Sequence, residues 1–409
     1  MGFDPSQLNA EARGLGNYGN NCANPGHRPE FGPDSGERDW VPGAGRRERL
    51  ALRERLWRLS SIADVRKCGK VPRGSRLPVV EGGRLTGLCT CHSVWVCPIC
   101  APEIRAARGA EIASAVAVRL RDGGGVTFGT GTLSHSGRHS LRSTYSLVVS
   151  AWHSVSVDLS VRKFRKAHGY WGFIRTTEIT HGVNGWHPHV HWLDLWEAEL
   201  EGWELIEYRD LVFGAWSRAV SRLSDRKAAA GRAVVLLPVR SGDAETLGNY
   251  LTEMSVNSAS FELTSISTKT ARRGGLGPFD ILARVHSVES KPWIDLWWEY
   301  EKATRGRRML GTSRGLLDRL EIGTEDPEPS EVGPVLAFVS AEHWSQLRWC
   351  TEAGLSGAQA VIEAAAVEGG QLAVDDAVRM LLGIEGPLPE READSVQLEL
   401  GPGDDGGMF

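Results

Sequence analysis

The chain of 409 residues lacks any apolar run that approaches the roughly 18 residues of a membrane-spanning helix. Its first residues also lack the basic segment followed by an apolar segment that marks a secretory signal. These absences exclude integral membrane proteins and predict a cytoplasmic protein without a membrane partner. With 41% hydrophobic residues the chain can bury a sizeable core, and its length suits two or three domains.

Cysteine is scarce, at seven residues, and five of these fall between Cys68 and Cys100. A disulfide framework would use an even number of cysteines, typically in a secreted protein. Clustered cysteines in a chain without a signal segment favour metal binding in a reducing compartment. We therefore expect a metal site in this segment and no structural disulfides.

Neither sign of charge dominates, because the net charge is only -4, but the two signs are unevenly distributed. Residues 321–409 contain 18 acidic against 3 basic side chains, so the rest of the chain is basic. Residues 45–76 alone contain 11 basic against 3 acidic side chains. Such an excess is typical of a phosphate-binding surface, although a solvated helix face gives the same pattern.

Composition and hydrophobic period divide the chain into four regions. Residues 1–44 are rich in Gly, Pro and Asn, which predicts a disordered arm. Residues 45–122 form a basic helix and a cysteine-rich module, and residues 123–320 alternate strand and helix patterns around an antiparallel centre. Residues 321–409 are acidic and predicted to be partly disordered, with one helical patch near residues 358–382. The pattern indicates an α+β fold.

The basic segment begins with an amphipathic helix over residues 46–59, in which leucines and Trp57 share one side and arginines fill the rest. Together with the basic residues that follow, it predicts a module that grips duplex DNA. The candidate DNA-binding residues are Arg46, Arg47, Arg53, Lys67, Lys70, Arg73 and Arg76.

Two runs rich in β-branched and aromatic residues, 171–180 and 187–195, flank a turn-forming stretch at residues 181–186. This pattern predicts a β-hairpin. If its turn is centred between Val183 and Asn184, Glu178 lies opposite His189 across the two strands.

The chemistry of this hairpin rests on His189 and His191, which as i and i+2 residues of a strand point to the same face and can share one divalent ion. Histidine pairs in strands are often only polar surface residues, and Glu178 could be an ordinary cross-strand partner. With Glu178, however, the set resembles a two-histidine, one-carboxylate site for Mg²⁺ or Mn²⁺ in a nuclease. His187 alternates onto the same face and is a second candidate for the third ligand.

The segment TTEITHGVNGWHPHVHWLDL resembles the histidine motif of the rolling-circle replication initiators of actinobacterial plasmids. These belong to the HUH endonuclease superfamily, named for two histidines that flank a hydrophobic residue, here Val190. The segments GLCTCHSVWVCPICAPEI, FGTGTLSH, NYLTEM and LWWEYEKATRGRRMLGTSRGL resemble the same family in the same order. The resemblance covers roughly residues 60–320. It implies an HUH endonuclease fold over residues 123–320, with a central antiparallel sheet flanked by helices and preceded by a zinc-binding module.

The resemblance also implies a nucleophilic tyrosine on a helix beside the metal. Of the six tyrosines, Tyr250 matches the family's tyrosine motif, although a helix tyrosine that packs on the sheet would give the same pattern. The family often has lysine three residues later, where this chain has Glu253. Because i and i+3 share a helix face, Glu253 is a candidate water activator, and Glu245 is a weaker one.

The implied reaction is a transesterification in which the tyrosine forms a 5'-phosphotyrosine and frees a 3'-hydroxyl. This reaction would make the chain a metal-dependent, site-specific single-strand endonuclease and strand transferase. Its expected partners are duplex and single-stranded plasmid origin DNA, a host helicase and a host DNA polymerase that extends the freed end.

The cysteine segment contains CPIC, in which Cys97 and Cys100 have the spacing of a zinc-binding turn. A tetrahedral site needs two more ligands, and Cys68 and Cys91 match the family's pattern. Cys89 and His92 are adjacent competitors that the sequence leaves open. We expect a structural Zn²⁺.

Two other classes of protein would share some of these features. A relaxase or transposase of the same superfamily is one, but relaxases typically place the tyrosine ahead of the histidines and transposases typically carry two on one helix. A non-catalytic, zinc-containing DNA-binding regulator is the other, and it would require the hairpin geometry to be incidental.

Overall fold

A computed structural model describes residues 45–240, 275–286, 290–322, 333–350 and 354–384. The proposed arm at residues 1–44 and the candidates Glu245, Tyr250 and Glu253 lie outside these residues. Among the helices within them, none is both long and apolar enough to cross a membrane.

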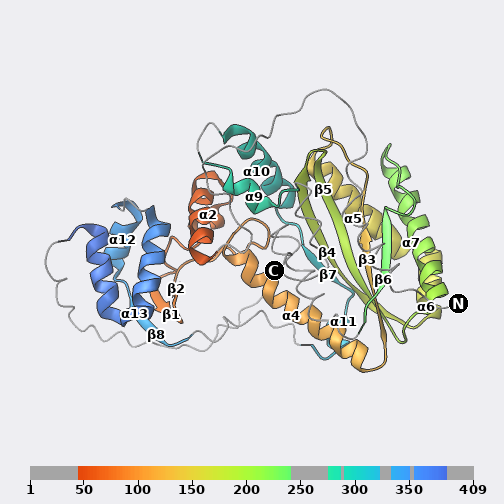
Figure 1. Cartoon of the computed structure of the whole chain (residues 1–409), viewed down its shortest axis with the longest axis horizontal. Helices are drawn as coiled ribbons and strands as arrows, with labels where there is room; N and C mark the ends of the chain where they lie inside the picture. The colour runs from red at the N-terminus through yellow and green to blue at the C-terminus, as the bar shows by residue number, and fades with distance from the viewer. Residues whose placement is uncertain (1–44, 241–274, 287–289, 323–332, 351–353, 385–409) are drawn as a thin grey trace, which may run out of the picture.

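The larger sheet has five antiparallel strands in the order β6-β3-β5-β4-β7. These strands are β3 (Gly125–Gly131), β4 (Tyr170–Gly182), β5 (Gly185–Trp196), β6 (Val234–Pro238) and β7 (Leu310–Thr312). Helices cover the sheet on both sides (Figure 1). The expected α+β class with an antiparallel centre is confirmed.

Strands β4 and β5 form the predicted hairpin, and β5 is the central strand of the sheet. Glu178 pairs with His189 as the turn position predicts. On its other side β5 pairs with β3, which places Thr130 opposite His191. His191 therefore lies where β5 is paired on both edges, and His189 lies just beyond the end of the pairing with β3.

Three helices cover one face of this sheet: α5 (Leu141–Val157), α6 (Leu159–Ala167) and α7 (Gly202–Leu223). Asp158 ends the first and begins the second, because its carboxylate accepts hydrogen bonds from the N–H groups of Ser160 and Val161. The apolar pattern had indicated only the first of these two helices. They bury the even-numbered side chains of β5, including Val190 and Trp192.

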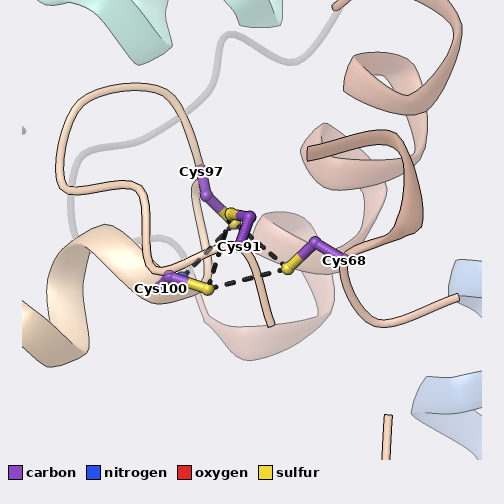
Figure 2. A group of neighbouring side chains, drawn as sticks. All are labelled: Cys68, Cys91, Cys97 and Cys100. Atoms are coloured by element: carbon purple, nitrogen blue, oxygen red, sulfur yellow. Dashed lines mark hydrogen bonds between the residues drawn. The ribbon is translucent and has the colours of Figure 1, made fainter. Parts of the chain in front are cut away.

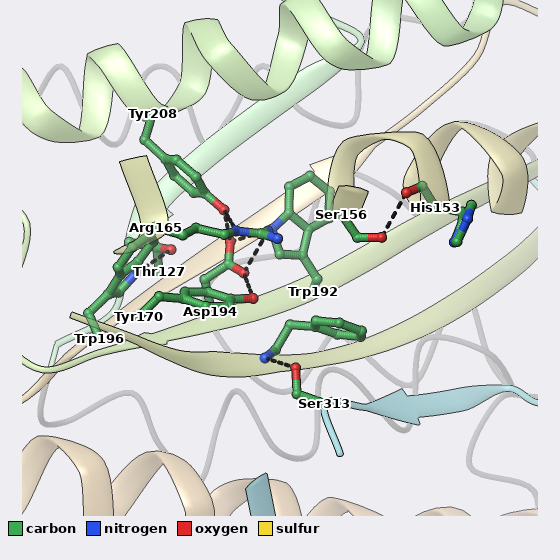
Figure 3. Close-up of polar contacts among 11 residues, drawn as sticks. Thr127, His153, Ser156, Arg165, Tyr170, Trp192, Asp194, Trp196, Tyr208 and Ser313 are labelled. Atoms are coloured by element: carbon green, nitrogen blue, oxygen red, sulfur yellow. Dashed lines mark hydrogen bonds and ion pairs between the residues drawn. The ribbon is translucent and has the colours of Figure 1, made fainter. Parts of the chain in front are cut away.

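A buried polar cluster fastens two of these helices to β5 (Figure 3). The Asp194 carboxylate is fully buried and accepts hydrogen bonds from the Tyr170 and Tyr208 hydroxyls, both at 2.8 Å. It also forms an ion pair with Arg165 of α6 at 3.2 Å and accepts a hydrogen bond of 2.8 Å from the Trp192 indole N–H. A buried carboxylate needs such partners to offset its lost hydration. The cluster lies on the even-residue face, opposite the histidines, and so has a structural role.

The opposite face, which carries the odd residues of β5, is covered by α4 (Cys100–Arg121) and α11 (Leu316–Arg319) along part of its length. Ile112 and Val116 of α4 pack there against Leu193 and Leu195. At the hairpin end, α9 (Pro278–Ala283) and α10 (Lys291–Thr304) pack around Trp186 in a separate apolar cluster.

The N-terminal basic segment forms α2 (Arg46–Leu59), with the predicted bounds, followed by α3 (Ala63–Lys67), β1 (Val79–Glu81) and β2 (Arg84–Thr86). It packs against a C-terminal lobe, which we define as β8 (Val335–Phe338), α12 (Ala341–Cys350) and α13 (Gly354–Leu382). Strand β8 completes a three-stranded sheet in the order β2-β1-β8 (Figure 1).

The acidic region is therefore more structured than its composition predicts. Trp57 and Val80 of the N-terminal segment share a core with Leu347, Ile362 and Val374 of the C-terminal lobe. Net charge does not report how apolar residues are spaced. Those of α13 recur along one side of the helix, where they are buried. The N-terminal segment and the C-terminal lobe are therefore packed against each other although residues 123–320 lie between them in the sequence.

Candidate functional site

The predicted metal triad comes together on adjacent strands. One ligand atom from each of Glu178, His189 and His191 lies within 4.8 Å of the others, and all three side chains are buried. The Glu178 Oε2 atom lies 2.5 Å from Nε2 of His189 and 3.2 Å from Nε2 of His191. Both imidazoles thus turn the same nitrogen toward one carboxylate oxygen.

The far nitrogens of these imidazoles have partners that fix the rings. Nδ1 of His191 lies 3.0 Å from the Thr130 hydroxyl, and this ring stacks on Phe128 with centroids 5.6 Å apart. Nδ1 of His189 lies 3.3 Å from the carbonyl oxygen of His187. Outer partners of this kind orient metal-ligating histidines. The sequence alone did not identify Thr130, because its role depends on the register between β3 and β5.

The charges of the triad are strongly linked. Burial alone would raise the pKa of Glu178, but the His189 charge and hydrogen bonds from both imidazoles lower it to about 2. Burial lowers the pKa of His189, yet the Glu178 carboxylate raises it by more. Burial lowers the pKa of His191. An anionic Glu178 therefore faces a readily protonated His189, and a divalent cation binding here would replace that proton.

His187, the second candidate for the third ligand, is not part of the triad. Its ring stacks on His135 with centroids 4.3 Å apart, and it lies 5.0 Å from the His189 ring. Burial lowers the pKa of both His187 and His135, so this pair is uncharged near neutral pH. His135 ends the FGTGTLSH segment, and only the fold brings it beside the hairpin.

The second group of metal-binding side chains consists of Cys68, Cys91, Cys97 and Cys100, whose sulfurs converge (Figure 2). Sγ of Cys68 lies 3.8 Å from that of Cys97 and 3.6 Å from that of Cys100. The Sγ atoms of Cys91 and Cys100 are 3.8 Å apart. Four sulfurs around one zinc at a bond length of about 2.3 Å would be about 3.8 Å apart. The group could therefore hold one tetrahedral metal ion.

The geometry separates these four residues from the two competitors. The Cys89 thiol donates instead to the carbonyl oxygen of Pro72 at 3.6 Å. The exposed His92 ring lies 2.7 Å from the Thr90 hydroxyl. The five cysteines of this segment, Cys68, Cys89, Cys91, Cys97 and Cys100, are free of disulfides.

Short elements position the four thiols. Cys68 directly follows α3, and Cys100 begins α4, where its N–H lies 3.4 Å from Sγ of Cys97. Hydrogen bonds from the other three thiols lower the pKa of Cys68 despite its burial. At least one thiolate is thus favoured even before a metal binds.

Helix α4 links the two groups. Its Arg105 is 2% exposed and donates from Nη2 to the carbonyl oxygen of Val94 at 2.6 Å. Burial lowers the pKa of Arg105 to about 10, although its electrostatic interactions with Tyr300 and Glu178 raise the pKa in part. A helix that begins at the cysteines therefore places a positive charge near the triad. Nothing in the sequence distinguishes this residue from an ordinary helical arginine.

The candidate DNA-binding residues divide into two sets by their exposure and their contacts. Arg47, Lys67, Arg73 and Arg76 are exposed, and Lys70 is half-buried with its ammonium over the Trp57 ring.

Arg46 instead forms a two-point ion pair with Glu363 at 2.7 and 2.8 Å, and Arg53 is only 4% exposed. The helical pattern placed both on the solvent side of α2, but α13 covers that side. The Arg53 guanidinium is therefore buried, and that of Arg46 is half-buried and paired with a carboxylate.

Known proteins provide a separate comparison. No family model and no solved structure matches the chain. A Streptomyces lividans protein named "Protein rep" is 28% identical over 310 residues, which cover 61% of this chain and 68% of that protein. The chain is similar to a Rep-type protein. A Streptomyces cyanogenus protein named "Neomycin resistance protein" is 29% identical over 141 residues, which cover 28% of this chain and 32% of that protein.

Proposed function

We propose that this chain is a plasmid replication initiator of the HUH endonuclease superfamily, which nicks one strand of origin DNA by tyrosine transesterification. The observation that carries the proposal is the convergence of Glu178, His189 and His191 within 4.8 Å on adjacent strands. The similarity to a Rep-type protein supports the replication role. The order of the motifs, with Tyr250 after the histidines, favours it over a relaxase.

The triad suits a divalent cation such as Mg²⁺ or Mn²⁺. Two imidazole nitrogens and one carboxylate oxygen leave open coordination positions, and Glu178 remains anionic because its pKa is about 2. When bound, such an ion supplies positive charge that neutralises a non-bridging phosphate oxygen. His189 and His191 would hold that ion, and the Thr130 hydroxyl orients His191.

In the proposed reaction, the Tyr250 oxygen attacks the scissile phosphorus and its proton passes to solvent or a nearby base. A bond forms between the tyrosine oxygen and phosphorus, and the bond from phosphorus to the 3' oxygen breaks. The 3' oxygen takes up a proton and becomes the primer for a host polymerase, assisted by a host helicase. Glu253, or less favourably Glu245, would activate the water that ends the reaction.

The cysteine group would hold a structural Zn²⁺, because four thiolates leave no position for water. The module around it would grip duplex DNA at the origin through the exposed basic residues Arg47, Lys67, Arg73 and Arg76, with Lys70 beside them. Separate modules would then hold the duplex and cut the strand.

The test is a covalent adduct assay on a single-stranded oligonucleotide carrying the plasmid's own nick region, with Mn²⁺ omitted and then restored. We expect Tyr250→Phe to abolish the adduct while duplex origin binding is retained, because the ring remains but the nucleophilic oxygen is lost. Tyr18→Phe serves as the matched control and should form the adduct normally.

Undiminished adduct with Tyr250→Phe would refute this tyrosine as the nucleophile. Origin binding by the wild-type chain without any adduct, with Mn²⁺ present, would instead support a non-catalytic regulator.

A further inference from the structure

Among the residues that the structure describes, Arg53 is a buried cation with no carboxylate partner. Its side chain is 4% exposed, and Nη2 donates to Oε1 of Gln359, a neutral amide. Its Nε atom is buried and has no hydrogen-bond partner in the described part of the chain. A buried guanidinium that lacks a counter-ion would be strongly destabilising. Its neutralising charge must therefore come from another kind of group.

The position of Arg53 identifies that group as the cysteines. A Cβ added to Gly69 would collide with Nη1 of Arg53, so the guanidinium lies directly against the backbone that follows Cys68. Gly69 has φ +64, a conformation that favours glycine in any case. Burial lowers the pKa of Arg53, and the charges of Cys68, Cys97 and Cys100 oppose this effect in part. As neutral thiols these residues would leave Arg53 uncompensated.

A four-thiolate centre with one divalent ion has a formal charge of -2, and burial makes that charge costly. Arg53 offsets half of it. We propose that Arg53 is the counter-charge of a four-thiolate metal centre, and that Gln359 couples docking of the C-terminal lobe to occupancy of that centre. The inference rests on the structural metal in the proposed function, but on no part of the proposed nicking chemistry.

The coupling runs through Gln359 of α13, which is 1% exposed. Its side-chain oxygen accepts from Arg53, and its Nε2 donates to the carbonyl oxygen of Gly69 at 2.5 Å. One amide thus contacts both the counter-charge and the residue next to a ligand.

A second contact comes from α12, where the Trp344 indole donates to the carbonyl oxygen of Lys70 at 3.1 Å. Both helices of the lobe therefore bind the backbone turn that leaves Cys68. If metal loss lets this turn relax, both contacts lose their acceptors.

The lobe also has contacts that do not involve the centre. Glu363 pairs with Arg46, and the Ser356 hydroxyl donates to the carbonyl oxygen of Leu50 at 2.7 Å. Metal loss should therefore loosen the segment around Gln359 without detaching the lobe completely. Linkage is reciprocal, so weakening the Gln359 contact must also weaken metal binding.

The first experiment measures metal affinity in the full chain. Co²⁺ replaces zinc as the probe, its thiolate charge-transfer absorption reports binding, and competition with a chelator gives the dissociation constant. We expect Arg53→Gln to weaken binding about 10- to 100-fold, as loss of an outer partner does. Arg53→Lys should retain most of the affinity, because it keeps the charge. Arg58→Gln, an exposed arginine of the same helix, is the control and should bind Co²⁺ normally.

The second experiment tests the coupling in both directions. Gln359→Leu should weaken Co²⁺ binding by about 5-fold or more, within the usual range of coupling between sites. Removal of metal from the wild-type chain should speed hydrogen exchange in residues 354–363 while β5 stays protected.

If Arg53→Gln binds Co²⁺ as tightly as the wild type, Arg53 is not the counter-charge of the metal centre. If the cysteines bind no metal, the whole inference is wrong. Equal exchange in residues 354–363 with and without metal would overturn the coupling. If Arg53→Gln does not fold, Arg53→Lys and Gln359→Leu still decide: a lysine variant that binds no better than an Arg53→Met variant excludes a charge effect. None of these measurements uses DNA, so they are independent of whether the chain nicks it.

Discussion

The two groups of metal-binding side chains differ in the number of donors and in their support. The cysteine group has four donors at nearly equal separations, carried by loops and by helix ends. The triad has three donors on two paired strands of a sheet. Four thiols enclose an ion and so suit a structural role, whereas three donors leave room for a substrate. The sheet holds the triad in place. At the cysteine group the order is reversed, because the bound ion would hold the surrounding loops in place.

The largest expected effect comes from breaking the triad. We expect His191→Ala to reduce metal-dependent nicking by about 1000-fold, because an ion that stabilises the transition state is worth several kcal/mol. The measurement is the single-turnover nicking rate across a Mn²⁺ titration. His153→Ala removes an exposed histidine from α5 and should nick at the wild-type rate.

Co²⁺ binding at the cysteines should be unaffected in the His191 variant, since the two groups share no ligand. Normal nicking by His191→Ala would place the catalytic metal elsewhere and remove the contrast between the two groups.

A smaller effect on the reaction, but a large one on folding, is expected at the cysteines. Cys100→Ser should lower the free energy of unfolding by a few kcal/mol and Tm by about 10 °C, because binding energy at a structural metal is folding energy. Thermal unfolding followed by circular dichroism tests this. Cys89→Ser is the matched control, since its thiol lies outside the group, and it should change stability by about 1 kcal/mol or less.

If both variants unfolded at the wild-type temperature, and chelation had no effect, the cysteine group would not be a structural metal centre.

The smallest effect is the pH dependence of Mn²⁺ binding at the triad. The pKa of His189 is raised by Glu178, so a proton competes with metal at the triad as the pH falls. Mn²⁺ affinity should therefore increase with pH through the raised pKa of His189, by at most about tenfold per unit. Isothermal titration at pH 6, 7 and 8 measures it.

In the metal-free protein, His189 affects the free energy of unfolding in the opposite direction from its effect on Mn²⁺ affinity. Its raised pKa stabilises the fold below the unfolded value of about 6.5, and this contribution is lost as pH rises through the folded pKa. Glu178 acts oppositely: its pKa of about 2 contributes stability above about 4.5 that is lost as pH falls toward 2. If Mn²⁺ affinity is the same at pH 6, 7 and 8, the proton on His189 does not compete with the metal.

Local patterns predicted the hairpin register and the bounds of α2, because strand and helix periods are properties of neighbouring residues. The same patterns misplaced Arg53, which a helical projection grouped with the solvent-facing arginines. Its burial depends on α13, more than 300 positions away, and no local period reports such a contact. Thr130 was missed for the same reason, since its contact with His191 is set by the pairing of β3 with β5. Tyr250 stays a prediction, because it lies outside the described residues.

Helix α4 has a mechanical consequence. It starts at Cys100, and near its other end Arg119 donates to the carbonyl oxygens of Trp196 and Glu197, both at 2.6 Å, where β5 ends. A single helix of 22 residues, about 33 Å long, is thus anchored at the cysteine group and at the strand that carries the histidines. Such a strut resists bending, so the two modules cannot swing independently. If one module binds the duplex and the other cuts a strand, the protein sets the distance between the bound sequence and the nick, and the flexibility of the DNA does not.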